Sequence, residues 1–107
     1  ETLPKSLLDG MLAAKTVGSG LETEHQIYYG LVDQRYHVAK EGRVDTTRVG
    51  VDMLGEIELY RPVPGTAFQA SFGHLMGYQA GYYSYLWSLV YAADMFERFR
   101  TMGLLNP

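Results

Sequence analysis

The chain has 107 residues, of which 47% are hydrophobic and 20% are charged, and its formal net charge is −3. This composition is too apolar for a disordered chain and lacks the basic excess on which nucleic-acid binding depends. The sequence contains no cysteine, which excludes disulfide scaffolds, thiol catalysis and cysteine-rich zinc sites. It begins with Glu1 instead of methionine and ends at Pro107, and we expect both ends to be cut from something longer.

The N-terminal half predicts three helices. Pro4 suits the first position of a helix that continues to about Lys15, because proline has no N–H to leave unpaired there. A second helix is expected over residues 21–39, after a break at residues 17–20. Asp45 begins a polar run that can cap a third helix, which extends to about Leu59.

Gly50 and Gly55 weaken the third helix by about 1 kcal/mol each. A connector is expected between this helix and the C-terminal part. Residues 60–71 contain Pro62, Pro64 and Gly65, which favours a loop or an extended segment.

The last predicted helix covers residues 79–102 and is apolar almost all round in its first half. Between Arg61 and Asp94 the sequence has no charged residue, but its most apolar run, residues 82–93, is much shorter than the ~20 residues that span a bilayer. We therefore expect a buried helix and no membrane segment. Three short helices offer few partners for a helix that is apolar on every side, which indicates a piece of a larger protein.

Six of the nine tyrosines lie between Tyr60 and Tyr91. If the segment is helical throughout, the ~100° rotation per residue places Tyr78, Tyr82 and Tyr85 in one narrow stripe. Tyrosine is ordinarily protonated at neutral pH, so three hydroxyls on one face could donate to one ligand. The alternative is a core stripe whose hydroxyls bond to the backbone.

Glycines and a histidine precede these tyrosines. Gly73, Gly77 and Gly81 recur every four residues, which suits close helix packing in a helix or a hinge in a loop. His74 has apolar neighbours in the sequence, and it is either a hydrogen-bonded core histidine or a ligand-binding one.

Other catalytic motifs are missing from the sequence. A zinc-peptidase helix has the pattern H-E-x-x-H, and His25, His37 and His74 do not form one. We therefore expect no complete metal site within this chain. Gly18-Ser19-Gly20 lacks the lysine of a phosphate-binding loop, and no Ser-His-Asp arrangement is indicated.

The run from Phe72 to Ser88, FGHLMGYQAGYYSYLWS, resembles the thimet oligopeptidase family of zinc metallopeptidases. The resemblance continues through residues 90–99 and 103–107. Upstream it includes the helix start at Leu3-Pro4, the break at Ser19-Gly20-Leu21 and residues 62–66, so that it covers essentially the whole chain. One departure is that a single glycine, Gly77, precedes Tyr78, where many members of the family have two.

The resemblance implies a role for each residue of this block. Tyr78 and Tyr85 would hydrogen-bond the scissile carbonyl as it becomes an oxyanion, and His74 would assist them as the third catalytic residue. Tyr82 would contact the substrate, and the segment from Gly73 to Gly77 would let Tyr78 swing inward on binding. The family's zinc ligands lie on the N-terminal side of the matched region, so the metal would belong to the parent enzyme and none to this segment.

We therefore expect an all-α chain, a bundle of about four helices, in which residues 1–107 are one helical segment of the catalytic domain of a larger zincin-type peptidase. The parent would be a zinc-dependent metalloendopeptidase or oligopeptidase that cleaves short peptides in the cytoplasm. Its partners would be peptides and the rest of the peptidase chain, without nucleic acid or membrane. The isolated segment is expected to be inactive, and exposed apolar helix would favour its self-association. Two alternatives remain: a helical structural or assembly fragment, and a helical module that binds a small ligand.

Overall fold

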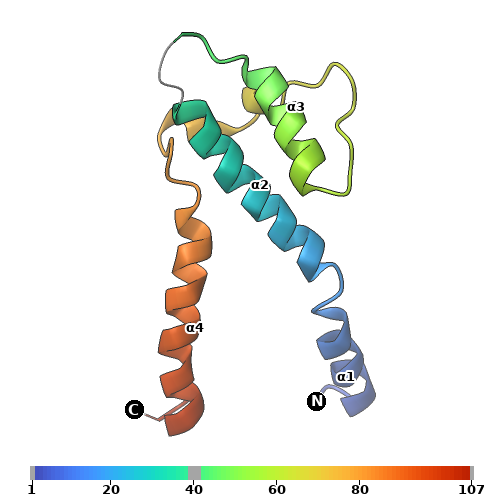
Figure 1. The fold of residues 1–107 in the computed structure, drawn as a ribbon. Coiled ribbons are helices and arrows are strands. Elements are labelled where there is room, and N and C mark those ends of the chain that lie inside the picture. Colours follow the sequence, from blue (N-terminus) through green and yellow to red (C-terminus); the bar gives the residue numbers. More distant parts are fainter. Residues whose placement is uncertain (1, 39–41, 107) are drawn as a thin grey trace.

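The structure, a computed structural model, describes residues 2–38 and 42–106, and within these ranges it is helical with no strand (Figure 1). The elements in chain order are α1 (Lys5–Ala14), α2 (Ser19–His37), α3 (Thr46–Ile57), the short 3₁₀ turns η1 (Phe68–Ala70) and η2 (Gly73–Met76), and α4 (Ser84–Met102). The all-α expectation is confirmed.

The first three helices follow the sequence signals closely. The Pro4 carbonyl accepts the first hydrogen bonds of α1, as expected for a proline at a helix start. Gly18 precedes α2 with a left-handed φ of 79°, which breaks the chain between α1 and α2. The predicted end of the second helix, Ala39, lies outside the described residues. Asp45 caps α3, because its side chain accepts the N–H of Arg48 at 3.0 Å.

Helices α2 and α3 pack against each other through two phenols. The Tyr28 hydroxyl donates to the Gly50 carbonyl at 3.3 Å, and the Tyr36 hydroxyl donates to the Thr46 carbonyl at 2.9 Å. Gly50 is buried, and a Cβ added there would lie 3.1 Å from the Tyr36 hydroxyl oxygen. Gly50 therefore lowers the helical propensity of α3 but leaves room for both hydroxyls.

The core joins distant parts of the sequence. Its buried hydrophobic side chains come from α2, from the residue before η2 and from the segment before α4; they are Tyr28, Val32, Phe72 and Tyr82. Half-buried side chains of α2, α3, η1 and η2 surround them: Tyr29, Tyr36, Val49, Met53, Leu54, Ile57, Phe68 and Leu75. The loop before α4 is thus part of the core.

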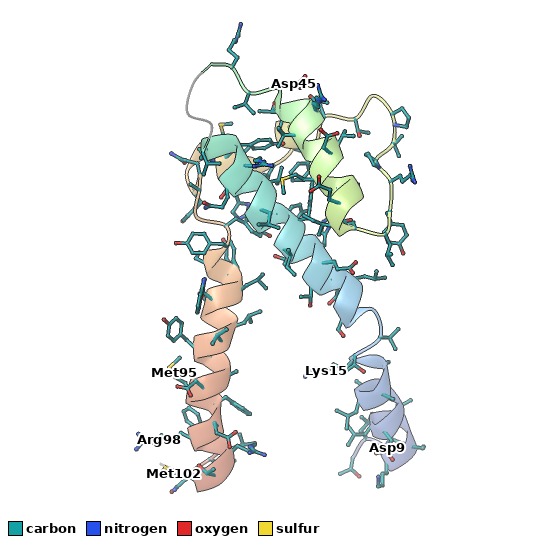
Figure 2. All side chains as sticks on the ribbon, viewed as in Figure 1. Asp9, Lys15, Asp45, Met95, Arg98 and Met102 are labelled. Carbon is teal, nitrogen blue, oxygen red and sulfur yellow. The ribbon has the colours of Figure 1, made fainter. Side chains whose placement is uncertain are left out.

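Helices α1 and α4 contribute no buried residue. Figure 1 shows α4 leaving the α2–α3 pair as a separate arm, and Figure 2 shows its side chains projecting outward, Met95, Arg98 and Met102 among them. The radius of gyration is 19.1 Å, against about 13 Å for a compact chain of this length. None of the helices in the described ranges has the length and hydropathy of a membrane span.

The predicted start of the last helix is wrong by five residues, because α4 begins at Ser84 and not at Gln79. Gly77 has an extended φ of −170° and Ala80 a left-handed φ of 59°, so the backbone between η2 and α4 cannot be one helix. The helical stripe of Tyr78, Tyr82 and Tyr85 is therefore also wrong, since only Tyr85 lies on α4.

Candidate functional site

The predicted site residues nevertheless meet around one side chain, His74. Its ring lies 4.9 Å from the ring of Tyr82, 5.7 Å from that of Tyr85 and 6.2 Å from that of Tyr78, measured between centroids. The two closer contacts are edge-to-face, the geometry that aromatic quadrupoles favour. His74 Nε2 lies 3.2 Å from the Tyr85 hydroxyl. η2, the following loop and the first turn of α4 thus converge on His74.

A cavity of about 630 Å³ opens beside His74. Its lining is mostly aromatic and comes from α2, η1, η2 and the following loop; the lining residues are Tyr29, Phe68, Ser71, Phe72, Gly73, His74, Tyr78 and Tyr82. Four of the six predicted site residues are therefore in the lining. Tyr85 reaches it through His74, and Gly77 lies in the backbone between two lining residues.

Tyr82 is the most buried of the three predicted tyrosines, with an exposed fraction of 7%. Its hydroxyl donates to Gln26 Oε1 at 2.8 Å. Burial, together with the neighbouring Tyr29 phenol, raises the pKa of Tyr82, although the bond to Gln26 opposes the rise. Tyr82 is therefore a neutral hydrogen-bond donor at neutral pH, and Gln26 already accepts its hydrogen bond.

Tyr78, Gly73 and Gly77 lie in open surroundings. The Tyr78 side chain is 72% exposed, and its N–H donates to the His74 carbonyl at 2.8 Å. A Cβ added at Gly73 or Gly77 would meet nothing within 4 Å. Neither glycine is required by close packing, so the alternative of tight helix packing fails at both, and the segment is a 3₁₀ turn followed by a loop.

Sequence reasoning missed the α2 and η1 contributions to the site. The Tyr29 ring stacks on Phe68 and Phe72, at 5.4 and 5.2 Å, and meets Tyr82 edge-on at 5.2 Å. The Tyr29 hydroxyl lies 2.6 Å from His25 Nε2. Burial and the Glu58 carboxylate raise the pKa of Tyr29. The only signal in the sequence was a second aromatic residue beside Tyr28, which does not reveal a contact with residues about forty to fifty positions away.

The loop that carries Tyr82 is held by α2. Asp33 is fully buried, and its Oδ1 and Oδ2 accept the N–H groups of Ala80 and Tyr82 at 2.8 and 3.1 Å. Gln34 donates to the Ala80 carbonyl at 2.7 Å. These bonds pair the N–H groups of Ala80 and Tyr82 and the carbonyl of Ala80, none of which is paired within a helix.

The donor groups of the described residues do not fit a metal ion. Over residues 2–38 and 42–106, no three His, Asp or Glu side chains gather closely enough to hold one. His25 is paired with Glu58, and His37 with Asp33, while the nearest polar groups to His74 are phenols. Phenols and a single imidazole are suited to hydrogen bonding at this site and do not make a zinc ligand set.

The whole sequence matches one family of peptidases. The profile of Peptidase family M3 matches residues 1–107. Oligopeptidase A of Escherichia coli is 45% identical over 112 residues, which cover 99% of this chain and 16% of that protein. Mitochondrial intermediate peptidase 2 of Cryptococcus neoformans is 42% identical over 99 residues, which cover 91% of this chain and 12% of that protein.

A third relative, the probable cytosolic oligopeptidase A of Arabidopsis thaliana, is 36% identical over 97% of this chain and 15% of its own length. The chain thus spans between 12% and 16% of the length of these three relatives. The family resemblance of the Phe72–Ser88 block is confirmed by the match over the full sequence. The chain belongs to peptidase family M3.

Proposed function

We propose that the complete peptidase containing this chain hydrolyses short peptides, and that this chain supplies the wall of the cleft that binds the peptide and stabilises the oxyanion. The observation that carries the proposal is the cluster of the His74, Tyr82 and Tyr85 rings beside an aromatic cavity of about 630 Å³. The family membership supports peptide-bond hydrolysis as the reaction.

We assign the zinc of such an enzyme to residues outside this chain, since the sequence has no H-E-x-x-H. When bound, zinc would polarise the scissile carbonyl and activate water. The part of this chain is to provide neutral hydrogen-bond donors on the opposite side of the substrate. Such donors bind charge that exists only in the transition state, so they raise the rate without tightening ground-state binding.

Tyr85 is the first donor, and His74 orients it. His74 Nε2 lies 3.2 Å from the Tyr85 oxygen. The tautomer of the imidazole determines which of the two groups donates the hydrogen bond. When Nε2 carries the proton, His74 donates to the Tyr85 oxygen, and the phenol proton of Tyr85 can point at the carbonyl. His74 then strengthens the donor and fixes its direction.

Tyr78 is the second donor and has to move. Its side chain is largely exposed, and the segment from Gly73 to Gly77 has space on its outer side. In our proposal this segment rotates when a peptide enters, which brings the Tyr78 hydroxyl toward the same carbonyl. Tyr82 and Gly73, both in the cavity wall, contact the peptide itself.

The remaining parts of the proposal concern partners and location. The exposed apolar surface of α4 would contact the rest of the peptidase chain, and in the isolated chain it would favour self-association. A cytoplasmic location is also a proposal, because the relatives include proteins named as cytosolic and as mitochondrial.

The test is Tyr85→Phe in the complete peptidase, with cleavage of a quenched fluorescent peptide as the assay. We expect kcat to fall by about 10²–10³-fold with little change in KM, the cost of losing one oxyanion donor. Tyr91→Phe is the matched control, because Tyr91 lies exposed on the same helix, away from His74. An unchanged kcat in Tyr85→Phe would refute the oxyanion role.

The isolated chain provides a second test. We expect the purified 107-residue chain to show no zinc-dependent cleavage of the same peptide, because the zinc ligands are assigned elsewhere. The measurement is the initial rate with and without added zinc and with a chelator. Chelator-sensitive turnover by this chain alone would overturn the assignment of the metal to other residues.

A further inference from the structure

Asp33 is the only charged or polar side chain that is buried in the described part of the chain. Both of its carboxylate oxygens accept backbone N–H groups, Oδ1 from Ala80 at 2.8 Å and Oδ2 from Tyr82 at 3.1 Å. His37, one turn later on α2, donates from Nδ1 to the Asp33 carbonyl at 2.7 Å, and its Nδ1 lies 3.3 Å from Oδ1. A buried carboxylate that binds two amides of a distant segment fixes that segment closely, because leaving it unpaired would be costly.

The segment that Asp33 binds is strained. Ala80 has a φ of 59°, the only left-handed φ of a non-glycine residue in the described ranges. Its N–H is bound by Asp33 and its carbonyl by Gln34, at 2.8 and 2.7 Å. A residue with a side chain is held in this backbone conformation by its surroundings, and here the surroundings are two consecutive residues of α2.

The same segment sets the position of the site tyrosines. Tyr82 follows Ala80 by two residues, and its ring meets His74 and Tyr85 at 4.9 and 5.0 Å. α4 begins at Ser84, so the direction of its first turn, and with it the Tyr85 hydroxyl, depends on where residues 80–82 are held. The loop lies directly on α2, because a Cβ at Gly30 would be 3.5 Å from the Tyr83 Cα.

We propose that Asp33, assisted by Gln34, is a positioning residue of the peptidase: it holds the backbone of residues 80–82 so that Tyr82 and Tyr85 face His74. This inference rests on the proposed function for its effect on catalysis. The holding of the loop is a separate structural statement that can be tested without any activity.

The test uses the complete peptidase with Asp33→Asn. Asparagine has the same shape but only one acceptor oxygen, so its NH₂ group must face one of the two N–H donors. We expect faster hydrogen exchange at the amides of Ala80 and Tyr82, and a kcat lower by roughly ten- to a hundredfold with KM changed by less than about threefold. Asp52→Asn is the control, because Asp52 is an exposed carboxylate on α3 that pairs with Arg48.

A second substitution separates positioning from general stability. Ala80→Gly relieves the left-handed strain, so in the Asp33→Asn background it should restore part of kcat. A role of Asp33 limited to packing within α2 predicts no such recovery. The proposal is overturned if Ala80→Gly does not improve the Asp33→Asn enzyme, or if amide exchange at Ala80 and Tyr82 is unaffected by Asp33→Asn.

Two further results keep the outcome clear. If Asp33→Asn does not fold, Gln34→Ala is tested in its place, because it removes only the bond to the Ala80 carbonyl. A lower kcat of this variant at an unchanged melting temperature supports the proposal. An unchanged kcat overturns it. If Tyr85→Phe has full activity, the proposed function fails, and hydrogen exchange at Ala80 and Tyr82 alone decides whether Asp33 holds the loop.

Discussion

The outer helices α1 and α4 are richer in apolar residues than the packed helix α2, yet their side chains are far more exposed. In the packed region, which comprises α2, α3, η1, η2 and the loop before α4, Val32 is 0% exposed; in α4, Val90 is 58% exposed. The difference shows that a hydrophobic helix is stabilised in tertiary structure only where other elements cover it. The candidate site lies at the boundary, since Tyr82 belongs to the packed region and Tyr85 to the outer helix.

The largest difference in stability between the two regions is expected when one phenylalanine of each region is replaced by alanine. Phe72→Ala should lower the free energy of unfolding by about 3–5 kcal/mol, because Phe72 is buried against Phe68, Tyr29 and Tyr82 and its removal leaves a cavity. Phe99→Ala on α4 should cost less than about 1 kcal/mol, since Phe99 is half exposed. Urea unfolding followed by circular dichroism measures both, and equal losses would contradict the division into two regions.

The packed region should also weaken at high pH. Burial, with smaller contributions from Tyr36 and Glu58, raises the pKa of Tyr28 well above its ordinary value near 10. Above pH ~10 the unfolded chain therefore releases this proton while the folded chain keeps it. The contribution of Tyr28 to the free energy of unfolding is fully present below pH ~10 and is lost as pH rises, by up to about 1.4 kcal/mol per pH unit.

Tyr28→Phe tests this assignment. The variant loses the bond to the Gly50 carbonyl and should be about 1 kcal/mol less stable at neutral pH. Its unfolding free energy, measured from pH 8 to pH 11, should fall less steeply than that of the unmodified chain. Two parallel curves would show that Tyr28 does not control the alkaline loss.

The smallest expected changes in stability distinguish the exposed Gly55 from the buried Gly50, both on α3. Gly55→Ala should stabilise the chain by about 1 kcal/mol, because the added Cβ meets nothing within 4 Å and alanine is the better helix former. Gly50→Ala should destabilise it by a similar amount, since Tyr36 and Tyr28 are held by their bonds to α3 and cannot move aside. Thermal melting of the two variants checks the sign, and stabilisation by Gly50→Ala would contradict the close contact.

Local signals predicted the helices well, and long-range contacts explain what they missed. The cap at Asp45 and the break at Gly18 act within a few residues, so the sequence revealed both. The segment before α4 is bound by Asp33 and Gln34, nearly fifty positions earlier in the sequence, and helical periodicity carries no information about such bonds. For the same reason the sequence did not reveal that Tyr29 and Phe68 line the cavity beside the tyrosine block.

The bond between Tyr82 and Gln26 has a consequence for recognition in the cavity. A peptide group that accepts the Tyr82 proton must first displace Gln26 Oε1, which already lies 2.8 Å away. The exchange replaces one hydrogen bond by another and leaves the Gln26 carbonyl to find a new donor, so it adds little net affinity. If this wall binds a peptide as proposed, discrimination would therefore depend on how well a residue fits against the faces of Tyr29, Phe72 and Tyr82, which favours shape over polarity.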